Sequence, residues 1–209
     1  MREAMLLVMM AALAAAQGPG EWQDILPGAD LKGWTRVAVP PEKPLGEVSQ
    51  WKVDKARRVL VCEGNGGHEW LRWDREIGNA VFHVEWRFAV ITAGKNYNSG
   101  IYIRNSADGR LWHQGQIGSA DGGYVFGSTI VAGAPQRFNL IKAMTEQRIK
   151  PAGEWNVSEL GADGRRITFR NNGAVTSEFP DCDVPRGYLG VEAEGYRIEF
   201  RNLRLKLLP

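Results

Sequence analysis

The sequence predicts an all-β protein that folds as one domain. No segment of the 209 residues keeps a helical period, whereas short runs of alternating apolar and polar residues recur between turn signals. The chain also has 25 glycines and 8 tryptophans, a combination that favours a turn-rich β protein over a helical bundle. Short strands of this kind are typical of a sandwich or barrel, and we expect two stacked sheets.

The clearest predicted strand covers residues 80–90. Every second residue from Ala80 to Val90 is apolar, and His83, Glu85 and Arg87 lie between them. Successive residues of a strand point to opposite faces, so these three polar side chains share one face. We expect the apolar face to pack in the core and the polar face to meet solvent or a ligand.

The other predicted strands show the same alternation over shorter lengths. They lie at residues 58–63, 69–73, 100–104, 111–117, 137–143, 155–160, 165–170, 174–179 and 197–206. Asp-Gly or Asn-Gly pairs at 108–109, 163–164 and 172–173 supply the positive φ that tight hairpins need. The last pair is predicted to close a hairpin, and the proline-rich segment 39–44 is predicted to be a surface loop.

Charge and motifs exclude several classes of function. The chain carries 26 Lys and Arg against 24 Asp and Glu, a formal net charge of +2, without the basic excess of a nucleic-acid binder. It contains no Gly-x-Ser-x-Gly elbow, no Walker A loop and no dinucleotide fingerprint. Neither nucleotide chemistry nor serine-hydrolase chemistry is supported.

The first sixteen residues have the features of a signal peptide. A short charged start precedes an apolar run at residues 6–16, which ends in three alanines that suit signal peptidase. The run is shorter than the roughly 20 residues that span a bilayer. We expect residues 1–16 to be removed, leaving residues 17–209 as one secreted or periplasmic domain without a membrane span. The alternative is a first helix buried in the fold.

Two cysteines, Cys62 and Cys182, leave two alternatives open. Export permits a disulfide between them, whereas two buried free thiols at strand positions fit the sequence equally well. The three histidines, His68, His83 and His113, are scattered, and no C-x-x-C or H-x-x-x-H spacing occurs. A structural zinc site is therefore not expected.

Four short segments of the chain carry a family resemblance. They are Asn-Ser-Gly-Ile-Tyr-Ile-Arg at 98–104, Lys-Pro-Ala-Gly-Glu-Trp-Asn at 150–156, Gly-Tyr-Leu-Gly at 187–190 and Phe-Arg-Asn-Leu at 200–203. In this order they resemble the 3-keto-disaccharide hydrolase domain family over residues 33–208. The resemblance implies a concanavalin A-like jelly roll, a sandwich of two antiparallel sheets whose concave sheet carries a carbohydrate cleft. It also implies cleavage of 3-keto-glycosides in exported glycan catabolism.

Two positions depart from the family pattern. The family's Glu-x-Gln strand, followed closely by Asp, is here Gln114-Gly115-Gln116, with Asp121 two positions late. Near the C-terminus, a Leu-Gln-x-His pattern is replaced by residues 191–194, Val-Glu-Ala-Glu. An amide at position 114 hydrogen-bonds a sugar hydroxyl but does not exchange a proton at neutral pH. One carboxylate is therefore lost and two are gained elsewhere.

The chemistry that the family implies needs three groups. A ketone at C3 acidifies the proton on C2, so cleavage needs a base near C2, an electrophile for the enolate oxygen and an acid for the leaving group. Glu85 is the first candidate for the base, and Arg104 or a bound divalent cation such as Ca²⁺ for the electrophile. His113 is a candidate acid or metal ligand, although alternation puts it on the face opposite Gln114, and Glu192 is a second candidate carboxylate.

Amide and aromatic side chains are the candidates for binding substrate. Asn98, Gln114 and Gln116 offer hydrogen bonds to sugar hydroxyls, and Trp112 and Tyr124 offer rings for stacking. Every candidate has a structural alternative. These are a solvated face for Glu85, an ion pair for Arg104, structural hydrogen bonds for His113, a turn for Asn98, and core packing for Trp112 and Tyr124.

Three functions follow from this sequence. The first is an exported hydrolase or lyase that acts on 3-keto-glycosides; the second is a lectin-like module that binds carbohydrate without turnover. The third is a purely structural or protein-interaction sandwich. A sugar site would be favoured if one cleft brought together the side chains of Glu85, Arg104, Gln114, Gln116 and Glu192. The sequence leaves the sugar, the metal ligands and the oligomeric state open.

Overall fold

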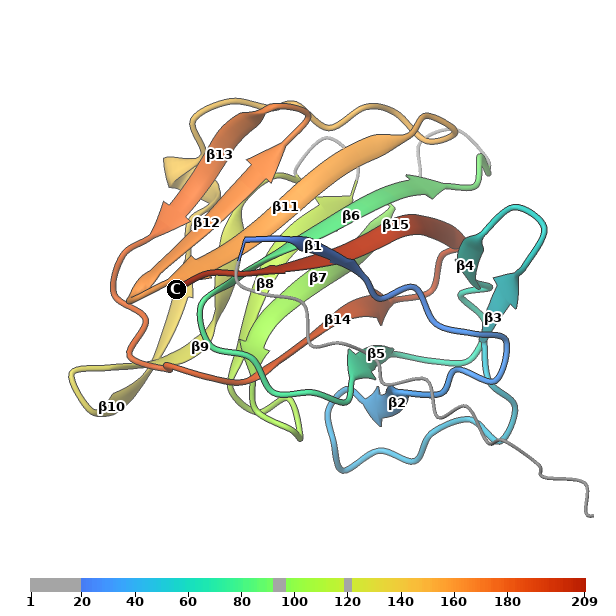
Figure 1. Ribbon diagram of the computed structural model, residues 1–209, viewed down its shortest axis with the longest axis horizontal. Coiled ribbons are helices and arrows are strands. Elements are labelled where there is room, and N and C mark those ends of the chain that lie inside the picture. Colours follow the sequence, from blue (N-terminus) through green and yellow to red (C-terminus); the bar gives the residue numbers. More distant parts are fainter. Residues whose placement is uncertain (1–19, 92–96, 119–121) are drawn as a thin grey trace, which may run out of the picture.

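A computed structural model describes residues 20–91, 97–118 and 122–209. The predicted signal peptide and Asp121 lie outside these residues. Figure 1 shows two β-sheets stacked face to face, with all strand pairs antiparallel. The predicted all-β sandwich of two antiparallel sheets is confirmed.

One sheet has eight strands. Its order is β13-β12-β11-β6-β15-β4-β3, and β1 also pairs with β15. The strands are β1 (Trp22–Asp24), β3 (Trp51–Asp54), β4 (Val59–Cys62), β6 (Ala80–Phe88), β11 (Asn156–Asp163), β12 (Arg166–Asn171), β13 (Ala174–Phe179) and β15 (Ile198–Leu207).

The other sheet has seven strands, in the order β10-β9-β8-β7-β14-β5-β2. They are β2 (Trp34–Ala38), β5 (Glu69–Trp73), β7 (Asn98–Asn105), β8 (Trp112–Gly118), β9 (Val125–Val131), β10 (Ala134–Asn139) and β14 (Tyr188–Ala193). A short 3₁₀ helix at Ile141–Ala143 follows β10.

The core lies between the two sheets. The apolar residues that alternate along β6, from Ala80 to Phe88, are at most 2% exposed, as the sequence predicts. They meet the inner face of the second sheet, where Ile101, Ile103 and Ile117 are fully buried. Burying one large apolar side chain stabilises the fold by about 1.5–3 kcal/mol. A slip of one residue would expose the whole row, so burial fixes the strand register.

Most predicted strands are present, with some differences. Asn172 and Gly173 both have positive φ and close the predicted β12–β13 hairpin. The segment predicted as one strand at 137–143 divides into the end of β10 and the 3₁₀ helix. The sequence did not predict the strands β1, β2, β3, β9 and β14.

Both cysteines are buried free thiols, which confirms that alternative over the disulfide. Cys62 Sγ lies 3.8 Å from Gln50 Oε1, whereas Cys182 Sγ lies 3.7 Å from Thr129 Oγ1. Burial raises the pKa of the Cys62 thiol to about 12, which keeps it protonated. In the described part of the chain, no helix has the length and apolar character needed to cross a membrane.

Candidate functional site

A cleft of about 610 Å³ lies on the outer face of the seven-stranded sheet. Strand alternation builds its floor: on β8, Trp112, Gln114 and Gln116 point into the cleft, while the residues between them point to the core. The rim includes residues 38–42 and 108–110. The proline-rich loop predicted from the sequence is thus one wall of the cleft.

Gln114 crosses a neighbouring strand to reach Glu192. Its Nε2 donates a hydrogen bond to Glu192 Oε2 at 2.7 Å, although β7 lies between β8 and β14 in the sheet. The crossing is possible because β7 has Gly100 at this point. A Cβ at position 100 would lie only 2.2 Å from Gln114 Nε2.

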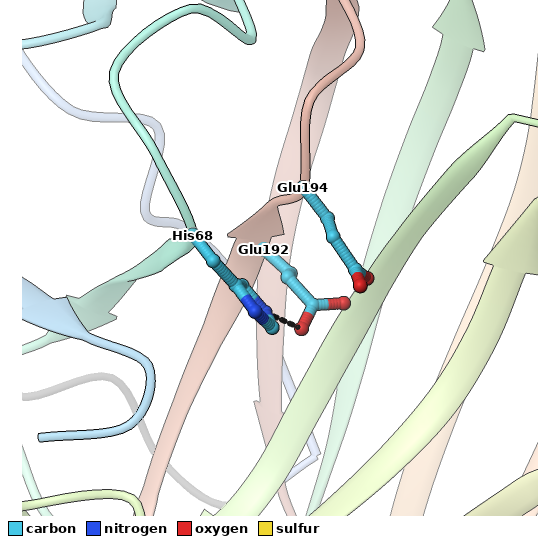
Figure 2. A group of neighbouring side chains, drawn as sticks. All are labelled: His68, Glu192 and Glu194. Carbon is cyan, nitrogen blue, oxygen red and sulfur yellow. Dashed lines mark hydrogen bonds and ion pairs between the residues drawn. The ribbon is translucent and has the colours of Figure 1, made fainter.

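Glu192 is buried and accepts hydrogen bonds on both oxygens. Its Oε1 lies 2.8 Å from His68 Nε2 and also accepts a hydrogen bond from the Tyr102 hydroxyl. His68 comes from the loop before β5, and Glu194 follows the end of β14. Figure 2 shows His68, Glu192 and Glu194 with their side chains directed toward one another.

The proximity of these groups changes their pKa values. Burial, followed by the negative charge of Glu192, raises the pKa of Glu194 to about 7. Burial lowers the pKa of His68, but its hydrogen bond to Glu192 and the nearby carboxylate charges outweigh this effect, so the pKa is raised. Burial and the charge of Glu192 also raise the pKa of Tyr102, whose hydroxyl therefore remains a donor.

A row of amides continues from Gln114 along the floor. Gln114 Nε2 lies 3.1 Å from Gln116 Oε1, and Gln116 Nε2 donates to Asn98 Oδ1 at 2.5 Å. Such amides offer both donors and acceptors to the hydroxyl groups of a sugar.

Aromatic rings line the cleft beyond these amides. Trp112 packs edge-on against Phe126, with ring centroids 4.9 Å apart, and Tyr124 lies 5.4 Å from the same phenylalanine. All five side chains predicted to bind substrate, the three amides and Trp112 and Tyr124, therefore line one cleft.

The rim contains two further carboxylates, and both are paired. Arg110 forms an ion pair with Glu42 from the facing loop, and its Nε lies 3.2 Å from Asp108 Oδ2. The Arg110–Glu42 pair joins the loop at 38–42 to the β7–β8 turn. These two exposed carboxylates therefore share a single arginine at the rim, whereas the partner of Glu192 is a histidine.

Glu85, predicted as the base, lies outside the cleft. It is on the polar face of β6 in the eight-stranded sheet, where Oε2 accepts from Arg201 Nε at 2.8 Å and Oε1 accepts from Asn202 at 2.6 Å. These bonds overcome the opposing effect of burial and lower its pKa. The prediction fails because the polar face of β6 belongs to the other sheet, and Glu85 has a structural role.

Arg104, predicted as the electrophile, points away from the cleft. Its φ of 53° interrupts the alternation of β7, so that Asn105 lines the cleft and Arg104 is buried. The guanidinium donates to the Gly164 carbonyl at 2.6 Å and to Asn79 Oδ1 at 2.8 Å. Arg104 therefore links segments of the fold and does not face a substrate.

His113, predicted as an acid or metal ligand, is fully buried between the sheets. Nδ1 donates to the Ile103 carbonyl at 3.2 Å, and Nε2 lies 2.7 Å from Thr129 Oγ1. Burial lowers its pKa to about 4. The imidazole is neutral and structural, as strand alternation indicated when it placed His113 opposite Gln114.

Glu192 is thus the one predicted catalytic residue inside the cleft, and His68 and Glu194 join it. The departure at residues 191–194 drew attention to the second carboxylate, but nothing in the sequence singled out His68. His68 approaches Glu192 because β5 pairs with β14, a contact across more than 100 residues. His68, Glu192 and Glu194 are also the described residues whose donor atoms could hold a metal ion.

Comparison with known proteins identifies a sequence family for this chain. Residues 21–206 match the sequence family described as the 3-keto-alpha-glucoside-1,2-lyase-like domain. A comparison with curated proteins gives no match.

Several solved structures share this fold at low sequence identity. A candidate glycosyl hydrolase from Parabacteroides distasonis is 16% identical with a TM-score of 0.63, covering 91% of this chain and 94% of that one. The carbohydrate-binding module CBM66 from Bacillus subtilis is 11% identical with a TM-score of 0.60, covering 83% and 95%. The β-glucanase of Bacillus licheniformis is 11% identical with a TM-score of 0.52, covering 93% and 100%. At these identities the similarity establishes a concanavalin A-like fold.

Proposed function

The chain belongs to the 3-keto-alpha-glucoside-1,2-lyase-like domain family, and from this premise we propose that it cleaves 3-keto-glycosides in the cleft of the seven-stranded sheet. The observation that carries the proposal is the convergence of His68, Glu192 and Glu194 at one end of a cleft lined by amides and aromatic rings. The proposal includes export of the chain after removal of residues 1–16.

The reaction begins at C2 of the oxidised sugar. A base takes the C2 proton, which the neighbouring ketone makes acidic. A C1–C2 double bond then forms as the bond between C1 and the glycosidic oxygen breaks, and an acid protonates the departing oxygen. Release at this point is a lyase reaction, and addition of water across the double bond completes hydrolysis. The route differs from that of glycosidases that use two carboxylates at C1.

The proton acceptor comes from the group formed by His68, Glu192 and Glu194. The other two carboxylates that line the cleft, Glu42 and Asp108, are held by Arg110 at the rim. The amides of Asn98 and Gln116 are placed to orient the sugar hydroxyls, and the rings of Trp112 and Tyr124 to pack against the sugar.

Product analysis by NMR tests the proposal. The protein is incubated with 3-keto-trehalose or 3-keto-lactose, and free sugar or the unsaturated ketone is followed with time. We expect release by the unmodified protein and a loss of about 10²-fold or more in Glu194→Gln. Glu85→Gln is the matched control, because Glu85 lies on the other sheet, and should retain the rate. No release of either product would overturn the proposal.

A lectin-like module is the second candidate. The amide row and the aromatic rings suit sugar binding without chemistry, and both oxygens of Glu192 already accept hydrogen bonds. Saturable chemical-shift changes with these sugars, without product, would select this candidate.

A further inference from the structure

We propose that the end of the cleft formed by Trp112, Phe126 and Arg137 binds the leaving group of the substrate, and that it prefers a flat ring bearing a carboxylate. The class of substrate is then a 3-keto-glycoside of a carboxylated phenol. That the bound ring is a leaving group rests on the proposed function. The preference of this end of the cleft for an acidic ring rests on the geometry of the chain alone.

The strand register places Arg137 and Trp112 on the same face of the seven-stranded sheet. Arg137 on β10 pairs with Ser128 on β9, and Ser128 pairs with Trp112 on β8. Residues directly opposite each other on neighbouring strands point to the same side of a sheet. Both side chains line the cleft, and the Arg137 guanidinium carbon lies 5.8 Å from the centroid of the Trp112 ring.

Arg137 differs from the other arginine of the cleft in having no carboxylate partner. Arg110 is shared by Glu42 and Asp108 at the rim. Within the residues that the structure describes, Arg137 forms no ion pair, and its side chain is exposed. A guanidinium remains charged in proteins and presents its N–H donors in a planar fork. Arg137 is therefore available to an anionic ligand.

The aromatic side chains beside Arg137 provide a wall for a flat ring. Trp112 packs edge-on against Phe126, with ring centroids 4.9 Å apart, and both side chains are partly exposed. A planar ring packs well against such aromatic side chains. A carboxylate on that ring forms parallel hydrogen bonds with a guanidinium, and these are stronger than hydrogen bonds between neutral groups. A neutral ring would use the aromatic wall but leave Arg137 without an acceptor.

The position of these residues in the sheet suits a leaving group. Trp112 on β8 lies two strand positions from Glu192 on β14, and Arg137 on β10 lies four positions away. With neighbouring strands about 4.8 Å apart, these separations are about 10 Å and about 19 Å. An aryl glycoside whose oxidised sugar lies beside Glu192 and extends along the row of amides would place its aryl group over Trp112, within reach of Arg137.

Arg137 also lies on an edge strand, where charged side chains commonly prevent one sheet from pairing with another. β10 is the last strand of the seven-stranded sheet. Protection of the edge needs only a charge directed to solvent, whereas Arg137 also lines the cleft. The two roles give different results, because a role in edge protection alone leaves ligand preference unchanged when Arg137 is replaced.

Binding is measured without turnover, with two glucosides that differ in one group. The full chain is titrated at pH 7 with 4-carboxyphenyl α-glucoside and with 4-carbamoylphenyl α-glucoside, its neutral counterpart of nearly the same shape, and chemical shifts are followed by NMR. We expect the carboxylate to bind about fivefold or more tightly than the amide. The preference should shrink at high salt, because the ion pair is accessible to solvent.

Substitution of Arg137 tests its role directly. Arg137→Gln should make the two affinities equal and leave that of the amide within about twofold, whereas Arg137→Lys, which retains the charge without the planar fork, should keep part of the preference. The matched control is Arg166→Gln, at an exposed arginine paired with Glu178 on the eight-stranded sheet, which should leave both affinities unchanged. Circular dichroism confirms that each variant is folded. Equal affinities in the unmodified protein, no binding of the carboxylate, or a preference that Arg137→Gln retains would overturn the inference.

This inference and the proposed function fail independently. The 3-keto forms of the same two glucosides are compared as substrates. Binding that favours the carboxylate, without cleavage of either 3-keto form, would retain the site for an acidic ring and reject the proposed function. Cleavage of both 3-keto forms with equal kcat/KM, together with equal binding of the two glucosides, would retain the function and reject the site.

Discussion

Gln114 and Glu192 are joined across an intervening strand by a hydrogen bond of 2.7 Å, in which the amide donates and the carboxylate accepts. The pair is buried and lies at the end of the cleft beside His68. Since Oε1 of Glu192 already accepts from Tyr102, the amide at 114 completes the carboxylate's partners. The identity of the two side chains is therefore coupled.

Because the two side chains are coupled, exchanging the amide and the carboxylate between positions 114 and 192 should destabilise the protein less than changing position 114 alone. Gln114→Glu places a second carboxylate against Glu192 and removes its donor, so we expect the free energy of unfolding at pH 7 to fall by about 1–3 kcal/mol. Adding Glu192→Gln restores an amide–carboxylate pair, and the double variant should recover most of the loss. Urea unfolding of the two single variants and the double variant gives the coupling energy. Additive losses would show that the two positions act separately.

Substitution of Gly100 should also disrupt the hydrogen bond between Gln114 and Glu192. In Gly100→Ala the new methyl group would lie 2.2 Å from Gln114 Nε2, so the amide must move away from Glu192. The clash extends along the side chain to Gln114 Cγ, at 2.6 Å. We expect a fall of about tenfold or more in turnover or sugar affinity, together with a loss of about 1–3 kcal/mol in the free energy of unfolding from the broken hydrogen bond.

Gly161→Ala is the control for this substitution. A Cβ at Gly161, on β11, would meet its nearest neighbours at 3.7 Å or more, which is ordinary contact. Its turnover and sugar affinity should match those of the unmodified protein. Unchanged turnover and affinity in Gly100→Ala would show that the crossing of Gln114 has no functional role.

Substitution of Arg104, which does not contact the cleft, should lower the stability of the fold. Arg104 is buried, and Arg104→Met leaves the partly buried Gly164 and Val184 carbonyls and Asn79 Oδ1 without this donor. We expect the free energy of unfolding to fall by about 3 kcal/mol. The exposed Arg166→Met should change it by less than about 1 kcal/mol. Equal effects in the two variants would contradict the structural role of Arg104.

Local patterns predicted the fold well because a sandwich is built from alternation and turns. The period of two along β6 and the Asn-Gly turn at 172–173 each depend on neighbours in the chain. The strands that were missed are short, as in β1, or follow glycine and proline, as in β14. Their existence depends on pairing with distant strands, which local periodicity does not report.

The site was predicted only in part, for the same physical reason. Alternation along β8 correctly placed Gln114 and Gln116 on one face and His113 on the other. It failed at Arg104, where a single positive φ reversed the direction of the side chain. Alternation also does not show that β6 and β8 belong to different sheets. Glu85 was therefore grouped with cleft residues that its side chain does not contact.

The buried imidazole of His113 predicts how stability depends on pH. Burial lowers its pKa to about 4 from an ordinary value of 6.5, and the nearby Arg104 charge opposes protonation. The unfolded chain therefore binds a proton between these values and the folded chain does not, so stability falls as pH drops from 6.5 to 4. The loss is about 3 kcal/mol for a shift of this size.

Comparing urea unfolding at pH 7 and pH 4.5 in the unmodified protein and in His113→Gln isolates this effect. Carboxylates that titrate in the same window contribute equally to both proteins. The glutamine variant should be less stable at pH 7, because it loses fitted hydrogen bonds, but should lose less stability on acidification. Parallel losses in the two proteins would mean that His113 is protonated in the fold, and that its contacts with Thr129 and Ile103 hold an imidazolium.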